Sequence, residues 1–219
     1  MFEIISYQSN LTGSDKMIAI IDYGAGNLRS VQKALEFLGH EAVVTNESSE
    51  ISASDKVILP GVGAFGDCMA SLKSLGLDSC IYDAIGAGKP FLGICLGLQL
   101  LFESSEESPG VAGLGVFKGK NVKIPPSEGL KIPHMGWNSI KFDPGCPLFE
   151  GFAPGSEPYM YFVHSYYMQP ENKEIISATT DYSAELPIAL HKDNVFALQF
   201  HPEKSGDDGL KILNNFAKL

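Results

Sequence analysis

Cys95 stands in the sequence pattern that is best suited to chemistry in this chain. It is the central residue of the G-x-C-x-G segment GICLG (93–97), between the apolar runs KPFLGIC (89–95) and LGLQLLF (96–102). This pattern is the thiol counterpart of the G-x-S-x-G nucleophile elbow, a strand-to-helix turn that is too tight for side chains on either flank. It predicts Cys95 at a helix N-terminus, where the partial positive charge favours thiolate over thiol. A buried cysteine in a glycine-rich turn is the alternative for this segment alone.

A general base for this thiol is offered by FALQFHPEKSG (196–206), where an apolar run ends at His201. Residues two apart in extended chain project to the same side, so Glu203 can meet one ring nitrogen of His201 while the other faces a thiol. Pro202 favours an extended His201, because the residue before proline is pushed away from helical geometry. With Cys95, these residues predict a Cys-His-Glu triad. A core histidine beside a surface glutamate is the alternative reading of this segment alone.

Acyl transfer also needs hydrogen-bond donors for an oxyanion. The backbone amide that follows the nucleophile, on Leu96, is the usual first donor. A second donor must come from a loop, and the run VILPGVGAFGD (57–67) places Gly61, Val62 and Gly63 directly after an apolar strand. Such a turn has bare backbone that can present an amide to a substrate.

The elements that must position these residues alternate between strand and helix from Met17 to about Phe102. The runs KVILP (56–60) and KPFLGIC (89–95) are continuously apolar, as expected of parallel strands that are covered on both faces. Past residue 110 the chain changes to short runs with Gly and Pro punctuation, which we interpret as antiparallel hairpins: 115–126, 136–142, 159–166, 173–180 and 194–200. The predicted fold is α/β, with a doubly wound, mainly parallel central sheet, helices on both faces and an additional antiparallel hairpin region.

The domain organisation is expected to be simple. A chain of 219 residues with 44% hydrophobic content suits one compact unit, here 17–219. Residues 1–16 precede a second methionine, Met17, and are interpreted as a leader or extension, either a tail or a short strand packed on the domain. Helices are predicted at 27–39, 67–76 and 96–102, and Ser205 is a candidate cap for a last helix.

Charge and composition exclude several classes of function. The net charge is −10, with 16 basic and 26 acidic residues, which argues against nucleic acid as a partner. The sequence has no apolar run of membrane-spanning length and no signal-peptide pattern, so we expect no membrane association and a cytoplasmic location. Four cysteines without a CxxC pair predict neither a metal site nor disulfides. No cofactor is expected, because Arg29 replaces the third glycine of a dinucleotide fingerprint that begins at Gly24.

These segments resemble those of a known family, the class I glutamine amidotransferases. The segments GICLGLQLLF and FHPEKS are shared broadly by that class, and the likeness runs from Met17 to the C-terminus. Four narrower segments are similar to the glutaminase subunit of imidazole glycerol phosphate synthase of histidine biosynthesis: IDYGAGNLRSV, PGVGAFGDCM, IPHMGWNSI (132–140) and YFVHSYY (161–167).

The resemblance implies hydrolysis of glutamine to glutamate and ammonia. Cys95 would attack the side-chain amide, His201 would move the proton, and Glu203 would orient the imidazole. The implied oxyanion hole consists of Gly61, Val62 and Leu96. The implied substrate-binding residues are Gly63, Gln99, Glu107, Ser165 and Tyr166. Glu103 and Glu106 lie close to Glu107 in sequence, so which of the three faces the pocket stays open at this stage.

The resemblance also implies a partner, a (β/α)₈-barrel cyclase that receives the ammonia and makes imidazole glycerol phosphate and aminoimidazole carboxamide ribotide. That partner would be a separate chain in a heterodimer, because 219 residues leave no room for a barrel of about 250 residues. Asn27, Trp137 and Tyr161 lie in segments that resemble its docking face, and a core position is the alternative for Trp137. If the Gly61-Val62 peptide can present either its carbonyl or its amide, the isolated subunit is expected to hydrolyse little glutamine.

Two other functions stay open on the sequence alone. One is a different enzyme of the same fold, either another amidotransferase glutaminase or a γ-glutamyl hydrolase. The other is a non-catalytic scaffold, against which the presence of all three triad residues argues.

Overall fold

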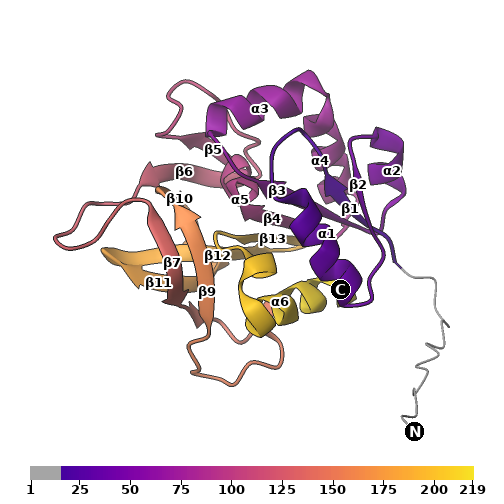
Figure 1. Cartoon of the computed structure of the whole chain (residues 1–219). Coiled ribbons are helices and arrows are strands. Elements are labelled where there is room, and N and C mark those ends of the chain that lie inside the picture. The colour runs from indigo at the N-terminus through magenta and orange to yellow at the C-terminus, as the bar shows by residue number, and fades with distance from the viewer. Residues whose placement is uncertain (1–15) are drawn as a thin grey trace, which may run out of the picture.

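A computed structural model describes residues 16–219 of the chain (Figure 1). The expectation of a leader at 1–16 lies outside the described residues, apart from Lys16. From Ile18 to Leu100 strands and helices largely alternate, and from Phe102 onward strands dominate until a last helix closes the chain. This order agrees with the change of texture that the sequence shows near residue 110.

An eight-stranded sheet forms the centre of the molecule, in the order β2-β1-β3-β4-β13-β12-β11-β8. The first five strands in this order are parallel, and β12, β11 and β8 are added antiparallel. The bounds are β1 Ile18–Ile21, β2 Ala42–Thr45, β3 Lys56–Gly61, β4 Phe91–Cys95, β8 Lys141–Phe142, β11 Ile176–Tyr182, β12 Ala184–Lys192 and β13 Val195–Leu198. Every residue of β1, β3, β4 and β13 is buried, as parallel strands between two helical layers must be.

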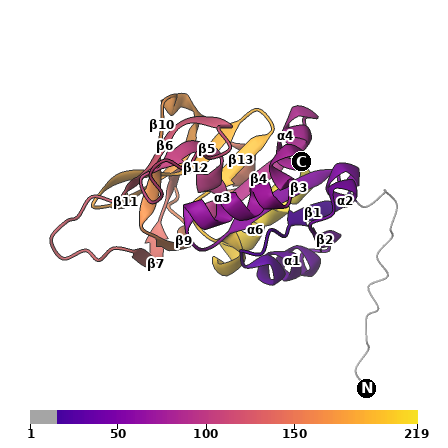
Figure 2. The same cartoon turned by 90° about the horizontal axis from the view of Figure 1, so that it is seen from above.

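Helices cover both faces of this sheet, and the alternation of side chains along β1 shows it. Ile18 and Ile20 belong to one core cluster with residues of α1 and α6, whereas Ala19 and Ile21 belong to a second cluster with residues of α2 to α5. The bounds are α1 Leu28–Phe37, α2 Ser48–Ala53, α3 Phe65–Ser74, α4 Leu77–Gly86, α5 Leu96–Leu100 and α6 Gly206–Lys218. Both layers can be followed in Figure 2. The predicted doubly wound architecture is confirmed.

Two smaller sheets lie beside the central one. A three-stranded sheet has the order β10-β6-β5, and a two-stranded antiparallel ribbon pairs β7 with β9. The bounds are β5 Phe102–Ser105, β6 Phe117–Lys123, β7 His134–Ser139, β9 Tyr159–His164 and β10 Tyr166–Pro170. β6, β7, β9 and β10 belong to the additional region that the sequence predicts after residue 110, whereas β5 precedes that region and pairs parallel with β6.

The structure differs from the sequence prediction in several details. Three runs that we interpret as hairpins, 194–200, 173–180 and the end of 136–142, contribute β13, β11 and β8 to the central sheet. β13 lies inside this sheet, parallel to β4 and antiparallel to β12. Its four residues are as continuously apolar as those of β4, a pattern that indicates burial on both faces but not which strands lie alongside. The sequence prediction does not include the helices α2 and α4 or the strands β5 and β12, and the run 159–166 divides at Ser165 into β9 and β10.

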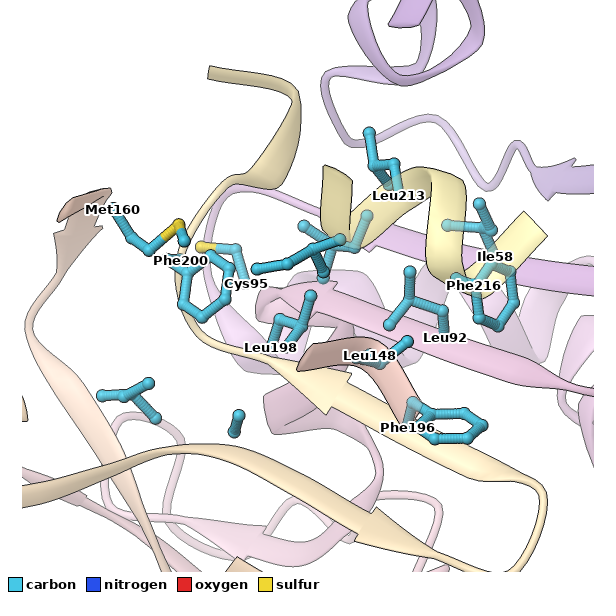
Figure 3. Packing of buried hydrophobic residues seen from close by; sticks show 14 of the residues in the cluster. Ile58, Leu92, Cys95, Leu148, Met160, Phe196, Leu198, Phe200, Leu213 and Phe216 are labelled. Carbon is cyan, nitrogen blue, oxygen red and sulfur yellow. The ribbon is translucent and has the colours of Figure 1, made fainter. Parts of the chain in front are cut away.

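Cys95 belongs to the first core cluster. Figure 3 shows it close to Met160 of β9 and Phe200, which also belong to this cluster, with Leu92 and Leu198 further along the same sheet. A buried aliphatic or aromatic side chain contributes about 1.5–3 kcal/mol. The ends of β4 and β13 that carry the predicted site are therefore anchored in a close-packed interior.

Candidate active site

The elbow at Cys95 has the geometry that the glycine pattern predicts. Cys95 is the last residue of β4 and directly precedes α5, and its φ of 55° is a strained value for a residue that is not glycine. A Cβ atom on Gly97 would overlap the backbone carbonyl oxygen of Leu59, and one on Gly93 would lie 3.0 Å from the Leu98 backbone. Glycine is required at both positions because the turn is pressed against neighbouring backbone.

His201 and Glu203 meet at the end of β13, as the sequence predicts. His201 Nδ1 lies 2.9 Å from Glu203 Oε1, and both side chains are almost fully buried. His201 is extended, as expected before Pro202, but Glu203 sits in a 3-10 turn and not in the extended chain that we assumed. This turn brings the Glu203 carboxylate within hydrogen-bond distance of His201 Nδ1.

The charge state of His201 follows from its neighbours. Burial lowers the pKa of His201, but contact with Cys95 and Glu203 outweighs burial and raises this pKa to about 10. His201 Nε2 is buried and has no hydrogen-bond partner among residues 16–219. A charged imidazole is therefore favoured beside a Cys95 thiolate, and one ring nitrogen is left for the sulfur or the substrate.

Two further residues hold this pair, and the sequence pattern did not reveal them. Asn27, which we expected at a docking face, donates from Nδ2 to Glu203 Oε1 at 3.2 Å. Ser205 occupies the N-cap position of α6, but its hydroxyl makes no cap hydrogen bond. It donates instead to the His201 carbonyl at 2.6 Å and accepts from the Tyr161 amide at 3.0 Å. Asn27 and Glu203 lie 176 residues apart and Tyr161 and Ser205 lie 44 apart, so no spacing rule could have found these two contacts.

The glycine loop after β3 is pressed against the elbow. Gly61 pairs with Cys95 in the β3–β4 register, and a Cβ on Gly61 would lie 2.7 Å from the Gly97 amide nitrogen. Tyr23 Oη donates to the Pro60 carbonyl at 2.9 Å and fixes the end of the strand. Val62 follows and is 42% exposed. The backbone of this loop therefore lies beside the nucleophile, where an oxyanion donor is needed.

A cavity of about 310 Å³ opens between the elbow, the glycine loop and the start of β10. It contains all five residues that were predicted to bind substrate, together with two residues of the triad and two of the predicted oxyanion hole. Its lining residues are Val62, Gly63, Cys95, Leu96, Gln99, Glu107, Pro133, Val163, His164, Ser165, Tyr166 and His201. The sequence did not indicate Pro133, Val163 or His164.

Of Glu103, Glu106 and Glu107, one faces this cavity. Glu107 lines it, and its Oε2 accepts from the Phe65 amide at 2.8 Å. Glu103 accepts from the Gly119 amide, and Glu106 pairs with Lys120 at 3.3 Å on the surface. Only Glu107 of the three belongs to the candidate site.

Trp137 is exposed and not part of the core. It is 55% exposed, pairs with Tyr161 in the β7–β9 register, and its ring meets the Tyr161 ring edge-on at 6.1 Å. Met135 and Tyr159 on the same ribbon are exposed as well. The ribbon thus presents an apolar aromatic surface, next to the segment that carries His201.

Within residues 16–219 no three His, Cys, Asp or Glu side chains are grouped as a metal site would require, and all four cysteines are unpaired. Over the same range no helix combines the length and the apolar character needed to cross a membrane.

The comparisons with known proteins agree with this arrangement. The family model for glutamine amidotransferase class-I matches residues 19–219. Imidazole glycerol phosphate synthase subunit HisH of Methanocaldococcus jannaschii is 54% identical over 203 residues, which are 93% of this chain and the whole relative. Subunit HisH 1 of Methanococcus maripaludis is 52% identical, with 93% of this chain and the whole relative covered. A solved structure of PurLQS from Thermotoga maritima is similar in fold, with a TM-score of 0.75 at 21% identity and coverage of 93% and 98%.

A doubly wound sheet with a cysteine elbow, and a match over nearly the whole chain, define the class of protein, a class I glutamine amidotransferase. Identities near 50% over nine tenths of the chain narrow this further. The chain belongs to the family of the imidazole glycerol phosphate synthase subunit HisH.

Proposed function

We propose that Cys95, His201 and Glu203 carry out glutamine hydrolysis in this chain, which as a member of the HisH family is the glutaminase subunit of imidazole glycerol phosphate synthase in histidine biosynthesis. The observation that carries the assignment is the meeting of three features at one cavity. These are a strained elbow cysteine, a buried imidazole with a raised pKa, and a carboxylate 2.9 Å from that imidazole.

The reaction begins once Cys95 has passed its thiol proton to His201, and Sγ, now a thiolate, attacks the side-chain carboxamide carbon of glutamine. The carbonyl oxygen becomes an oxyanion, and the charged His201 gives its Nε2 proton to the departing nitrogen, which leaves as ammonia. A thioester remains on Cys95. His201, now neutral, takes a proton from a water molecule that attacks the thioester, and glutamate is released. Glu203 keeps the imidazole oriented and stabilises its charged form in both steps.

The oxyanion is assigned to backbone donors on either side of the nucleophile. The Leu96 amide follows Cys95 directly, and the Val62 amide lies on the loop that Gly61 presses against the elbow. One such donor is typically worth about 10²-fold or more in rate. A loop that presents its carbonyl in place of its amide would leave the hole incomplete, so we expect the isolated subunit to be slow.

The cavity is of a size suited to one amino acid, and its polar groups suit the head group of glutamine. Glu107 supplies a carboxylate for the α-ammonium group. Gln99 uses Nε2 within the protein, toward the Tyr166 carbonyl at 3.2 Å and Gln199 Oε1 at 3.0 Å, so its Oε1 is left as an acceptor. Gly63, which has backbone groups alone, and Ser165 also line the cavity.

The partner is proposed to be a (β/α)₈-barrel cyclase on a separate chain that takes up the ammonia. Subunit HisH relatives are by name parts of a larger synthase, which supports a partner subunit. The exposed Trp137 beside Tyr161 supports the β7–β9 ribbon as the docking surface, since exposed tryptophans are frequent interface anchors. The Tyr161 amide donates to the Ser205 hydroxyl, which donates to the His201 carbonyl. Docking at this ribbon would therefore act on the position of His201.

The proposal is tested with Cys95→Ala in the assembled synthase, with Cys80→Ala as the matched control. Cys80 is a partly exposed thiol on α4, outside the cavity. We expect glutamate production to fall by at least about 10³-fold in the first variant and to be unchanged in the second. Glutamine hydrolysis at the normal rate by folded Cys95→Ala protein would refute the assignment and would favour a non-catalytic role for the elbow.

A further inference from the structure

Gln199 is a buried polar residue beside the nucleophile that the reaction described above does not use. It follows β13 directly, its side chain is fully buried, and its backbone N–H donates to the Ile188 carbonyl at 2.8 Å. Its side-chain Nε2 lies 3.8 Å from Cys95 Sγ. Gln199 and His201 are two residues apart, so one short segment directs both side chains toward the same sulfur.

The orientation of the Gln199 amide is fixed by a chain of hydrogen bonds that ends on a backbone carbonyl. The Tyr166 carbonyl can only accept, so the Gln99 atom 3.2 Å from it must be the amide nitrogen, Nε2. The same Nε2 lies 3.0 Å from Gln199, which must therefore present its oxygen, Oε1. The remaining end of the Gln199 amide is the NH₂ group, and it faces Cys95. Reversal of either amide would set two acceptors or two donors against each other in a buried site.

We propose that Gln199 is a further catalytic residue of this glutaminase, which donates a hydrogen bond to Cys95 Sγ and holds the sulfur as the thiolate that attacks glutamine. The inference rests on the proposed role of Cys95. A donor bonds more strongly to a charged acceptor than to a neutral one, so this contact stabilises thiolate relative to thiol. His201 supplies a positive charge to the same sulfur, and Gln199 supplies a second, neutral donor.

The position of Gln199 predicts which kinetic quantity it controls. Gln99 lines the cavity assigned to glutamine, whereas Gln199 lies behind Cys95 and is not among the lining residues. Its loss should therefore lower turnover and leave the apparent affinity for glutamine nearly unchanged. A purely structural role would lower stability without changing the pH dependence of thiol reactivity.

The test uses Gln199→Met in the full-length chain, because methionine keeps the length of the side chain and removes the donor. The rate of Cys95 alkylation by iodoacetamide is measured from pH 5 to pH 10, with the Cys95 adduct quantified by peptide mass spectrometry. We expect the midpoint of this profile to rise by about one pH unit and the rate at pH 7 to fall about five- to tenfold. In the assembled synthase, kcat should fall by a similar factor, with KM within about twofold.

Gln169→Met is the matched control, because Gln169 is an exposed glutamine on β10 that donates to Tyr167 Oη at 2.9 Å, and its profile should equal that of the unmodified chain. Gln199→Glu is the second variant if methionine prevents folding; it keeps the shape and should raise the midpoint further, because a carboxylate opposes a thiolate. An unchanged midpoint in either folded Gln199 variant would overturn the inference. If Cys95 of the unmodified chain reacts no faster at pH 6–7 than it does in the denatured chain, the proposed role of Cys95 itself fails.

Discussion

The two halves of the site owe their geometry to different causes. At the elbow the backbone alone decides the shape, because Gly93, Gly97 and Gly61 lie where neighbouring backbone leaves no room for a Cβ atom. Around the general base His201, side-chain hydrogen bonds from distant segments determine the geometry, such as the bond from Asn27 to Glu203. A backbone that admits only glycine can be recognised from a short stretch of sequence, whereas a polar contact between distant residues cannot. Substitutions at the elbow should therefore destabilise the fold, whereas substitutions around His201 should lower activity in a protein that still folds.

The largest expected effect is that of Gly97→Ala, which tests the backbone half. The new Cβ would overlap the Leu59 carbonyl, so β3 and α5 must move apart, at a cost of about 3 kcal/mol or more. Gly86→Ala is the control, since a Cβ at this helical glycine meets nothing within 4 Å and should stabilise the chain by about 0.5–1 kcal/mol. Thermal unfolding of both variants measures the difference. Equal melting temperatures would contradict the backbone account of the elbow.

The side-chain half is tested most severely by Glu203→Gln. The substitution keeps the shape but removes the charge that holds the His201 imidazole, so kcat should fall by about 10²- to 10⁴-fold. The unfolding transition should persist, and KM for glutamine should change little, because Glu203 does not line the cavity. An unfolded Glu203→Gln variant, or a folded and fully active one, would contradict the proposed difference between the two halves of the site.

This distinction also explains how much of the molecule could be predicted from the sequence. The elbow, the parallel strands and the His201–Glu203 pair depend on neighbours a few residues apart, and all three were predicted correctly as structural features. The place of β13 was missed although its apolar run resembled that of β4, because strand order depends on contacts between distant residues. The roles of Asn27 and Gln199 could not be predicted for the same reason, since their partners lie 176 and about a hundred residues away.

The His134–His164 pair is another long-range contact, and it predicts a pH dependence of stability. His134 Nδ1 lies 3.0 Å from His164 Nε2, and His164 Nδ1 donates to the Tyr166 carbonyl, an arrangement that two neutral rings satisfy. Burial lowers the pKa of His134 to about 4 and is the main cause that lowers the pKa of His164 to about 3. The unfolded chain protonates both near pH 6.5 while the folded chain does not. The free energy of unfolding should therefore fall below pH 6.5, by about 1.4 kcal/mol per pH unit for each histidine.

Urea denaturation between pH 4.5 and 6.5 measures this slope, with His134→Phe as the comparison. Phenylalanine can keep the stacking on Phe162 and Tyr182 but cannot be protonated. The slope should decrease by about 1.4 kcal/mol per pH unit in the variant. His201 acts in the opposite direction, because its raised pKa contributes stability below pH 6.5 that is lost as the pH rises toward 10. An unchanged acid slope in His134→Phe would show that the pair does not control it.

The smallest expected effect is that of Asn27→Ala, which removes one hydrogen bond to Glu203. Such a bond contributes about 1 kcal/mol, so kcat should fall about fivefold at saturating partner subunit. Binding of the partner, measured by titration calorimetry, separates the two roles that Asn27 can have. Normal kcat together with weakened partner binding would assign Asn27 to the docking surface alone.

The central claim is that Cys95 is the nucleophile, and covalent labelling tests it most directly. A glutamine-mimicking diazo-oxo-norleucine is incubated with the assembled synthase, and the modified peptide is mapped by mass spectrometry. We predict one adduct per chain, on Cys95, formed in step with the loss of glutaminase activity and prevented by glutamine. Loss of activity with the adduct on Cys68, Cys80 or Cys146 and with Cys95 unmodified would contradict the account.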